Sequence, residues 1–263
     1  QGNRRLGLVA LGKVIALEDA GEVDDFAKKT LGIDEVEPWD RPYAAEKLRE
    51  ARYSYSDAEV KRYFTQNAVF AGLFRMVETL FGIEIEEKRA SVWHPDVKYF
   101  EVKREGKLIA AFYADLYARE GKRSGAWMDG ERTRRRLPAG QLGTPVAYLV
   151  TNFAAPVEGR EATMTHDEVT TLFHEFGHTL HHILTAQEEA QVSGINGVEW
   201  DAVELPSQFL ENFAWEHDVV KAISRHADTG ESLPDELFSK MIAAKNFEAG
   251  AFCVRLVEFA LFH

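Results

Sequence analysis

The sequence has a single cysteine, Cys253, among its 263 residues, so no disulfide can form within the chain. A lone cysteine is typical of a reducing compartment, and we expect a cytoplasmic location. Cys253 lies in an apolar helical pattern, which predicts a buried and unreactive thiol. Positive charge is in deficit as well, because 31 Lys and Arg face 43 Asp and Glu for a formal net charge of −12. A phosphate backbone would be repelled, which argues against nucleic acid as a partner.

Long apolar runs are also absent from the sequence. No run approaches the roughly 18 consecutive apolar residues of a membrane-spanning helix, so no membrane partner is expected. Hydrophobic residues still make up 45% of the chain and aromatic residues 11%, which is enough for a substantial core. The chain begins without Met and ends at Phe262 and His263 within an apolar helical pattern. We therefore expect an internal fragment that is incomplete at both ends.

The spacing of apolar residues changes twice along the chain. Residues 22–82 carry helical spacing, and helical spacing returns over residues 159–263. Residues 83–158 are β-rich instead, with candidate strands at 83–86, 97–102, 108–117 and 146–153. Residues 104–106 fit the turn of a hairpin between two of these strands. The sequence thus predicts a mainly α (α+β) fold with a small, mostly antiparallel sheet, and residues 1–21 remain unassigned.

The stretch at residues 165–184 carries the strongest chemical signal, because His174 to His178 read H-E-x-x-H. Thr165 and Glu168 predict a capping box at the start of a helix, and apolar residues recur at helical spacing behind them. On a helix, residues four apart lie on the same face, so both imidazoles can bind one tetrahedral Zn²⁺. Glu175 would then reach the water that completes the site. The alternative is a surface helix with two solvated histidines.

A zinc site with an open position needs a third protein ligand. One known pattern places Gly at position 181 and a third His at 184, but this chain has His181 and Leu184 there. A carboxylate from a second helix is the remaining option. The residues that share one stripe of that helix are Asp201, Glu204, Gln208 and Glu211. Because Pro206 is tolerated only near a helix start, Glu204 is expected in the first turn.

The segments around these residues resemble the thimet oligopeptidase / oligopeptidase A family of zinc metallopeptidases, most closely its bacterial oligopeptidase A branch. The resemblance rests on H-E-F-G-H at 174–178, S-G-I-N-G-V at 193–198 and D-A-V-E-L-P-S-Q-F-L-E-N-F at 201–213. It extends to W-H-P-D at 93–96, D-L-Y-A-R-E at 115–120 and G-A-W-M-D at 125–129. It covers about residues 22–263, and its motifs are very specific.

The resemblance implies a role for each matching residue. His174, His178 and Glu204 correspond to the metal ligands of one Zn²⁺ per chain, and Glu175 to the general base. It also implies a multi-helix zincin-type catalytic domain over residues 22–263, made of a helical part (22–82), a small β region (83–158) and zinc-binding helices (159–263). Asp201 and Glu211 are hypothesised to hold the ligand imidazoles through hydrogen bonds.

The predicted function is that of a zinc-dependent endopeptidase, which hydrolyses internal bonds of short oligopeptides through a water activated by Glu175. The restriction to short oligopeptides is implied by the resemblance alone, and a monomer is expected. The alternative is a catalytically incomplete zinc-binding fragment that acts as a peptide-binding or structural module. The resemblance places two groups that assist the reaction, a Gly/Tyr-rich loop and a His, beyond residue 263.

Three further expectations concern the surroundings of the site. By resemblance, residues 145–153 form the edge strand that pairs with an extended substrate, with an ordinary sheet strand as the alternative. His181 is interpreted as a residue that lines the cleft or supports a ligand, and His94 as a structural turn residue. The basic run at residues 131–136 is interpreted as a solvated loop, and a contact to a peptide carboxylate is the alternative.

Overall fold

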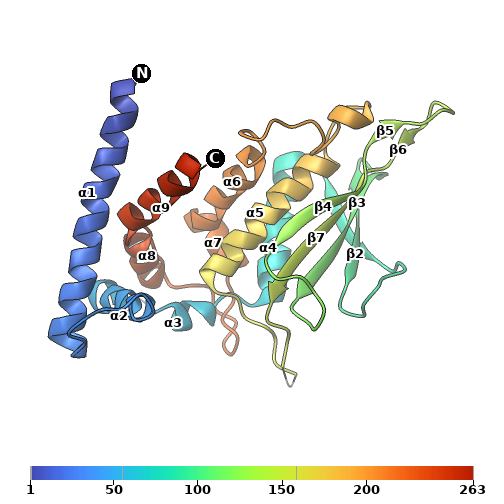
Figure 1. Cartoon of the computed structure of the whole chain (residues 1–263). Coiled ribbons are helices and arrows are strands. Elements are labelled where there is room, and N and C mark those ends of the chain that lie inside the picture. Colours follow the sequence, from blue (N-terminus) through green and yellow to red (C-terminus); the bar gives the residue numbers. More distant parts are fainter. Residues whose placement is uncertain (1, 55, 158, 263) are drawn as a thin grey trace. The chain divides into compact units, whose positions relative to one another are not determined.

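The computed structural model describes residues 2–54, 56–157 and 159–262, with the backbone alone for residues 2–11, 261 and 262. The chain divides into two compact units (Figure 1). One unit is formed by residues 1–56 together with 234–263, and the other by residues 57–233.

The first unit is helical. Its helices are α1 (Gly2–Phe26), α2 (Arg41–Tyr53), α8 (Asp235–Ala244) and α9 (Ala249–Phe262). A π-helical turn extends α1 and ends at Gly32, whose φ of 72° is left-handed, a conformation that glycine adopts without steric cost. Its core contains Val23, Ala27, Ala44 and Leu48.

One expectation for this unit is wrong, because Cys253 on α9 is exposed. The helix packs along α1, but Phe252, Leu256 and Phe259 on it are exposed as well. An apolar helical pattern shows which residues could be buried, and only the packing partner determines which ones are.

The second unit combines a sheet with helices. Its strands are β1 (Glu84–Lys88), β2 (Lys98–Arg104), β3 (Lys107–Tyr117), β4 (Trp127–Arg132), β5 (Arg135–Arg136), β6 (Leu142–Gly143) and β7 (Val146–Phe153). Its α-helices are α3 (Asp57–Lys61), α4 (Gln66–Phe81), α5 (His166–Ile183), α6 (Leu205–Glu211) and α7 (His217–Ile223). This arrangement confirms the predicted α+β fold with a small sheet before the helix that carries the H-E-x-x-H motif.

The main sheet has the strand order β1-β2-β3-β7-β4. Three of its four pairings are antiparallel and only β3 and β7 are parallel, which confirms a mostly antiparallel sheet. The predicted hairpin turn between β2 and β3 is present, with Glu105 and Gly106 at φ of 51° and 72°. These values suit the type I′ turn that two-residue hairpins favour.

Strand β4 was not predicted, and it changes which strand is at the edge. Strand β7 lies between β3 and β4 and is hydrogen-bonded on both sides. The expectation that residues 145–153 form the edge strand is therefore wrong, and β4 lies at that edge. The basic run at residues 131–136 is largely solvent-exposed, as expected, but it is not a simple loop, because it ends β4 and forms β5. The local sequence could not show this, because sheet order depends on pairing between distant segments.

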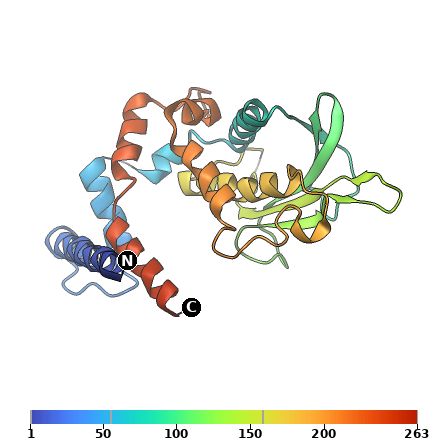
Figure 2. The same ribbon diagram turned by 90° about the horizontal axis from the view of Figure 1, so that it is seen from above.

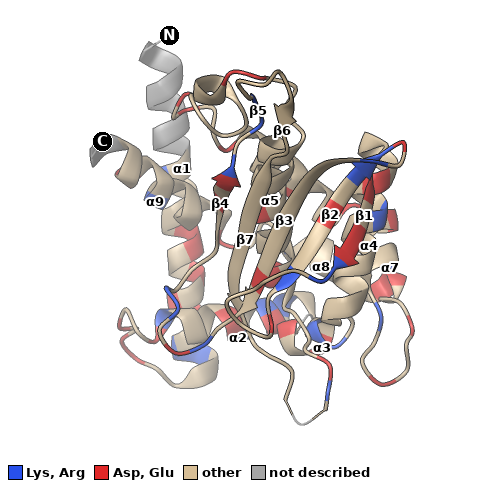
Figure 3. Ribbon diagram, turned by 90° about the vertical axis from the view of Figure 1, so that its right-hand side faces the viewer, with Lys and Arg blue, Asp and Glu red and all other residues tan. Residues whose placement is uncertain are grey.

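The two faces of the sheet differ, as alternation along a strand requires. On one face, Phe74 of α4 and Phe176 of α5 pack against Phe112 of β3, and both helices cover this face (Figure 2). On the other face, Tyr113 contacts Tyr99 and Tyr148 of the neighbouring strands. Charged residues gather on β1 and at the end of β4, whereas β7 carries none (Figure 3). Helix α5 therefore packs directly on one face of the sheet.

Hydropathy adds one observation. Among the helices of the described residues, none is both long enough and apolar enough to cross a membrane.

Candidate metal centre

Helix α5 begins where the sequence predicts it. The Thr165 hydroxyl accepts a hydrogen bond from the Glu168 backbone N–H at 3.1 Å, and the Glu168 carboxylate accepts one from the Thr165 N–H at 2.7 Å. This capping box satisfies two backbone donors that a helix start leaves unpaired. Val169, Phe173 and Phe176 on the opposite face are fully buried. The helix is thereby fixed against the sheet and presents a different face to the site.

His174 and His178 lie one turn apart on that face. Their ring centroids are 4.9 Å apart and their planes are nearly perpendicular, at 83°. The two side chains keep 26% and 13% of their surface exposed, so both rings reach an accessible space.

Glu204 reaches the two histidines from the second predicted segment. It is the residue just before α6, and its Oε2 lies 3.2 Å from His174 Nε2 and 3.1 Å from His178 Nε2. The Ser207 hydroxyl donates a hydrogen bond to the same Oε2 at 2.8 Å, which orients the carboxylate. Pro206 in the first turn of α6 agrees with the predicted helix start.

Gly177, within the H-E-x-x-H motif, allows α6 to approach α5 this closely. A Cβ at this position would lie 2.6 Å from the Pro206 carbonyl oxygen and 2.7 Å from the Ser207 Cα. Glycine in a helix interior costs about 1 kcal/mol relative to alanine. A glycine inside a helix is therefore a signal in the sequence that something packs closely there. Which element packs there is visible only in the structure.

The donor set fits a metal ion. One ligand atom from each of His174, His178 and Glu204 lies within 4.8 Å of the others. Two imidazole nitrogens and one carboxylate oxygen are the ligands of a catalytic zinc with an open fourth position. Burial lowers the pKa of the His178 imidazole, which favours the neutral form that can bind a metal.

A carboxylate on the far side of His174 completes this arrangement. Glu211 Oε1 on α6 lies 2.6 Å from His174 Nδ1, as one of the two hypothesised partners should. Because a carboxylate only accepts, Nδ1 carries the proton and the Nε2 lone pair is left for a metal. Asp201 lies in the turn before α6 and, within the part of the chain that the structure describes, contacts neither ligand histidine.

Glu175 occupies a different environment from the ligands. It is buried, and burial raises the pKa of its carboxyl, with the neighbouring His174 and Glu204 acting in opposite directions. A carboxylate with a raised pKa holds a proton more readily, which is the property that a general base needs in order to return the proton later.

The sequence also predicted roles for two other histidines, His181 and His94. His181 lines a pocket of about 450 Å³ formed largely by residues of α5 and α6, but none of His174, His178 and Glu204 lines this pocket, so its predicted role at the cleft stays a prediction. His94 Nδ1 accepts a hydrogen bond from the Asp96 N–H at 3.3 Å, which agrees with a structural turn. His182, for which the sequence predicted no role, is buried against β4.

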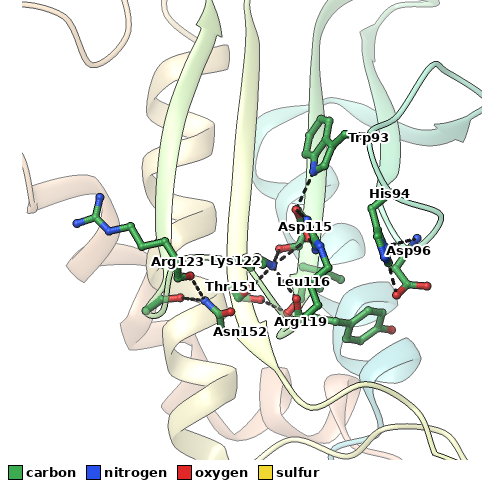
Figure 4. Close-up of polar contacts among 12 residues, drawn as sticks. Trp93, His94, Asp96, Asp115, Leu116, Arg119, Lys122, Arg123, Thr151 and Asn152 are labelled. Atoms are coloured by element: carbon green, nitrogen blue, oxygen red, sulfur yellow. Dashed lines mark hydrogen bonds and ion pairs between the residues drawn. The ribbon is translucent and has the colours of Figure 1, made fainter.

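A second polar cluster lies at the ends of β3 and β7 (Figure 4). Asp115 accepts two hydrogen bonds from Arg119, at 2.5 and 2.7 Å, and one from the Trp93 indole at 2.9 Å. The Lys122 ammonium donates to Asp115 Oδ1 at 2.9 Å and to the carbonyls of Asp115, Tyr117 and Thr151. Burial alone would raise the pKa of Asp115, but these donors hold it well below its usual range.

Comparison with known proteins gives the family context of this geometry. The sequence matches the model of peptidase family M3 over residues 15–263. It is 52% identical to "Oligopeptidase A" of Escherichia coli (strain K12) over 247 residues, 93% of this chain and 36% of the relative. It is 42% identical to "Probable cytosolic oligopeptidase A" of Arabidopsis thaliana, again over 93% and 36%. It is 36% identical to "Dipeptidyl carboxypeptidase" of Salmonella typhimurium, over 97% of this chain and 37% of the relative.

The chain thus spans little more than a third of the length of these relatives. Their names describe peptidases.

Proposed function

Because the chain belongs to peptidase family M3, we propose that it carries the zinc site of an endopeptidase that hydrolyses internal bonds of short oligopeptides. The observation that carries this proposal is the convergence of both motif histidines on one oxygen of Glu204, at 3.2 and 3.1 Å. The buried Glu175 beside His174 adds the acid–base group that hydrolysis requires.

His174, His178 and Glu204 would hold one zinc ion per chain, and Glu211 would fix the orientation of His174. When bound, zinc supplies Lewis-acid chemistry, which polarises the scissile carbonyl and lowers the pKa of water towards about 7. Glu175 takes a proton from the attacking water on its carboxylate and passes it to the leaving amine. The raised pKa that burial gives Glu175 supports this role.

Strand β4 is the proposed partner of the substrate backbone. It lies at the edge of the sheet, antiparallel to β7, and it contacts α5, the helix that carries both histidines. An extended peptide can add to such an edge through main-chain hydrogen bonds. Because these bonds do not depend on side chains, β4 would align many sequences in the same register along the sheet edge.

Several wider statements belong to the same proposal. The relatives' names support peptides as substrates, and the name of one plant relative supports a cytoplasmic location. The catalytic domain over residues 22–263 and the monomeric state also stay proposals. Neither nucleic acid nor membrane is proposed as a partner, in line with the net charge of −12.

A catalytically incomplete zinc-binding module is the second candidate. Donors for the oxyanion of a peptide-hydrolysis transition state are not identified among the described residues. The two candidates share the zinc site and differ only in turnover.

Elemental analysis of the purified chain, with a quenched fluorescent oligopeptide assay on the same samples, tests both candidates. We expect one zinc per chain, lost in Glu204→Gln and kept in Glu175→Gln, with activity lost in both variants. Glu199→Gln is the matched control, because Glu199 is exposed and lies five residues before Glu204. Zinc without turnover in the unmodified chain would favour the incomplete module, and absence of zinc would contradict both candidates.

A further inference from the structure

His182 connects the helix that carries the metal ligands to the edge strand of the sheet. It lies one turn beyond His178 on α5 and is 1% exposed. Its Nε2 lies 3.1 Å from the carbonyl oxygen of Arg132, the last residue of β4. The mechanism proposed above assigns no task to this buried side chain.

The contact determines which ring nitrogen carries the proton. A carbonyl oxygen only accepts, so His182 Nε2–H is the donor and Nδ1 keeps its lone pair in a neutral ring. Nδ1 is buried without a hydrogen-bond partner among the described residues. The hydrogen bond to Arg132 and the packing around the ring therefore hold it in position.

Two glycines leave the space that this ring occupies. A Cβ on Gly130 of β4 would lie 2.7 Å from His182 Cε1, and a Cβ on Gly194 would lie 2.5 Å from His182 Nδ1. The ring is thus enclosed between the edge strand and the loop after α5. Any larger residue at position 130 would have to move the strand or the ring.

The hydrogen bond is made where β4 is irregular. The register between β4 and β7 shifts between Gly130 and Arg132, which marks a β-bulge. A bulge bends a strand and re-aims its end. His182 therefore contacts β4 at the residue just after the shift, at the bent end of the strand.

The opposite end of β4 is held by other elements (Figure 4). The Asn152 side chain of β7 donates hydrogen bonds to the carbonyls of Arg123 and Gly125, at 2.8 and 2.6 Å, just before β4 begins. Lys122 anchors the same connection to β3 and β7. The start of β4 is therefore tied to the sheet, whereas His182 ties its end to the metal-binding helix.

We infer that His182 is a positioning residue for the substrate, which holds β4 at a set distance from the metal ligands through its hydrogen bond to Arg132 and its packing on Gly130. This inference rests on the proposed function, in which β4 pairs with the peptide backbone. Loss of the contact should weaken peptide binding while His174, His178 and Glu204 keep their contacts with one another, which do not involve His182.

The variants separate the hydrogen bond from the volume of the ring. His182→Leu removes the donor, whereas His182→Gln keeps an N–H that can reach the Arg132 carbonyl. Gly130→Ala disturbs the same contact from the strand. Gly143→Ala is its matched control, because a Cβ at Gly143 would have no neighbour closer than 3.5 Å.

For each variant, zinc content, kcat and KM on a quenched fluorescent oligopeptide, and hydrogen exchange of the β4 amides would be measured. In His182→Leu and Gly130→Ala we expect KM to rise about tenfold, the scale of one lost hydrogen bond in a buried site. Zinc content and kcat should change less than KM, and β4 exchange should become faster. His182→Gln and Gly143→Ala should stay within about twofold of the unmodified chain, since the contact is kept.

An unchanged KM in His182→Leu would overturn the inference, and so would a loss of zinc or kcat without a change in KM. Failure of the proposed function has a different signature, because the unmodified chain would then bind no zinc or cleave no peptide. In that case hydrogen exchange still decides the role of His182, since unchanged β4 exchange in His182→Leu would overturn it.

Discussion

Two polar clusters of the sheet-containing unit each contain a carboxylate, but its neighbours differ between the two clusters. At the metal centre, two imidazole nitrogens and a carboxylate face one another, and the Glu204 side chain remains 50% exposed. At the ends of β3 and β7, the Asp115 carboxylate is surrounded by Arg119, Lys122 and Trp93. There the Asp115 and Lys122 side chains are only 6% and 5% exposed.

The difference shows how a ligand site can be told from a structural cluster. The first cluster brings together three electron-pair donors, which would hold the proposed zinc ion. In the second, the buried carboxylate is paired with two cations and every Lys122 donor has an acceptor. Buried charges that pair with each other belong to the fold, whereas lone pairs that converge from three side chains indicate a place for a ligand.

The sharpest test of this contrast is Lys122→Met. It leaves Asp115 buried with one cation fewer and should lower the free energy of unfolding by about 3–5 kcal/mol, without changing zinc content. Urea unfolding measures the first quantity and elemental analysis the second. Lys98→Met is the control, because its ion pair with Glu87 is about half exposed and should contribute less than about 1 kcal/mol. A similar loss in both variants would contradict a special role for the buried cluster.

Acid should remove part of the same stabilisation. The pKa of Asp115 is lower in the folded chain than its ordinary value near 3.8, so its contribution is fully present above that pH. It is lost as the pH falls through the lower folded pKa. We expect Asp115→Asn to reduce the decline in stability below about pH 4, measured by urea unfolding across pH. An identical pH profile in the variant would contradict the assignment.

Bound zinc should raise the free energy of unfolding of the chain only when the zinc ligands are intact. At a free zinc concentration a hundredfold above Kd, linkage predicts a gain of about 2.7 kcal/mol in the free energy of unfolding. A chelator should reverse this gain. His178→Asn should abolish the gain that zinc gives. Lys122→Met should show the same gain as the unmodified chain, although its free energy of unfolding without zinc is lower. An equal gain in His178→Asn would place the zinc elsewhere.

The smallest expected effect concerns the residue that orients His174. Glu211→Gln keeps an acceptor near Nδ1 but removes its charge, so zinc affinity should fall about tenfold to a hundredfold. Competition with a chelator of known affinity measures this change, and the exposed Glu216 gives the control Glu216→Gln. Unchanged affinity would mean that the 2.6 Å contact does not tune the metal site.

The predictions made from sequence succeeded where the signal was local. The capping box at Thr165, the spacing of His174 and His178, and the helix start at Pro206 each depend on residues within one or two turns. Glu211 was one of two hypothesised partners, and the stripe on the second helix led to it. Asp201 failed because the helix begins only at Leu205, so the stripe does not extend back to it.

Strand order, by contrast, could not be read from residues 83–158. Strand β4 contains Gly130 and three charged residues, a composition that does not predict a strand. It becomes one because β7 offers a partner along its whole length. The prediction that Cys253 is buried failed for a related reason, since the packing partner and not the apolar pattern decides which helix face is covered.

The sequence by itself determined the helix at residues 166–183, the pair of imidazoles on one of its faces and the acidic segment that follows, because turns of a helix place nearby residues in fixed relation. Only the tertiary structure decided that α6 meets α5 at Gly177, that β4 and not β7 is the edge strand, and that His182 joins that edge to the helix. These are contacts between segments up to 50 residues apart. No local periodicity encodes them, because they follow from the packing of the whole unit.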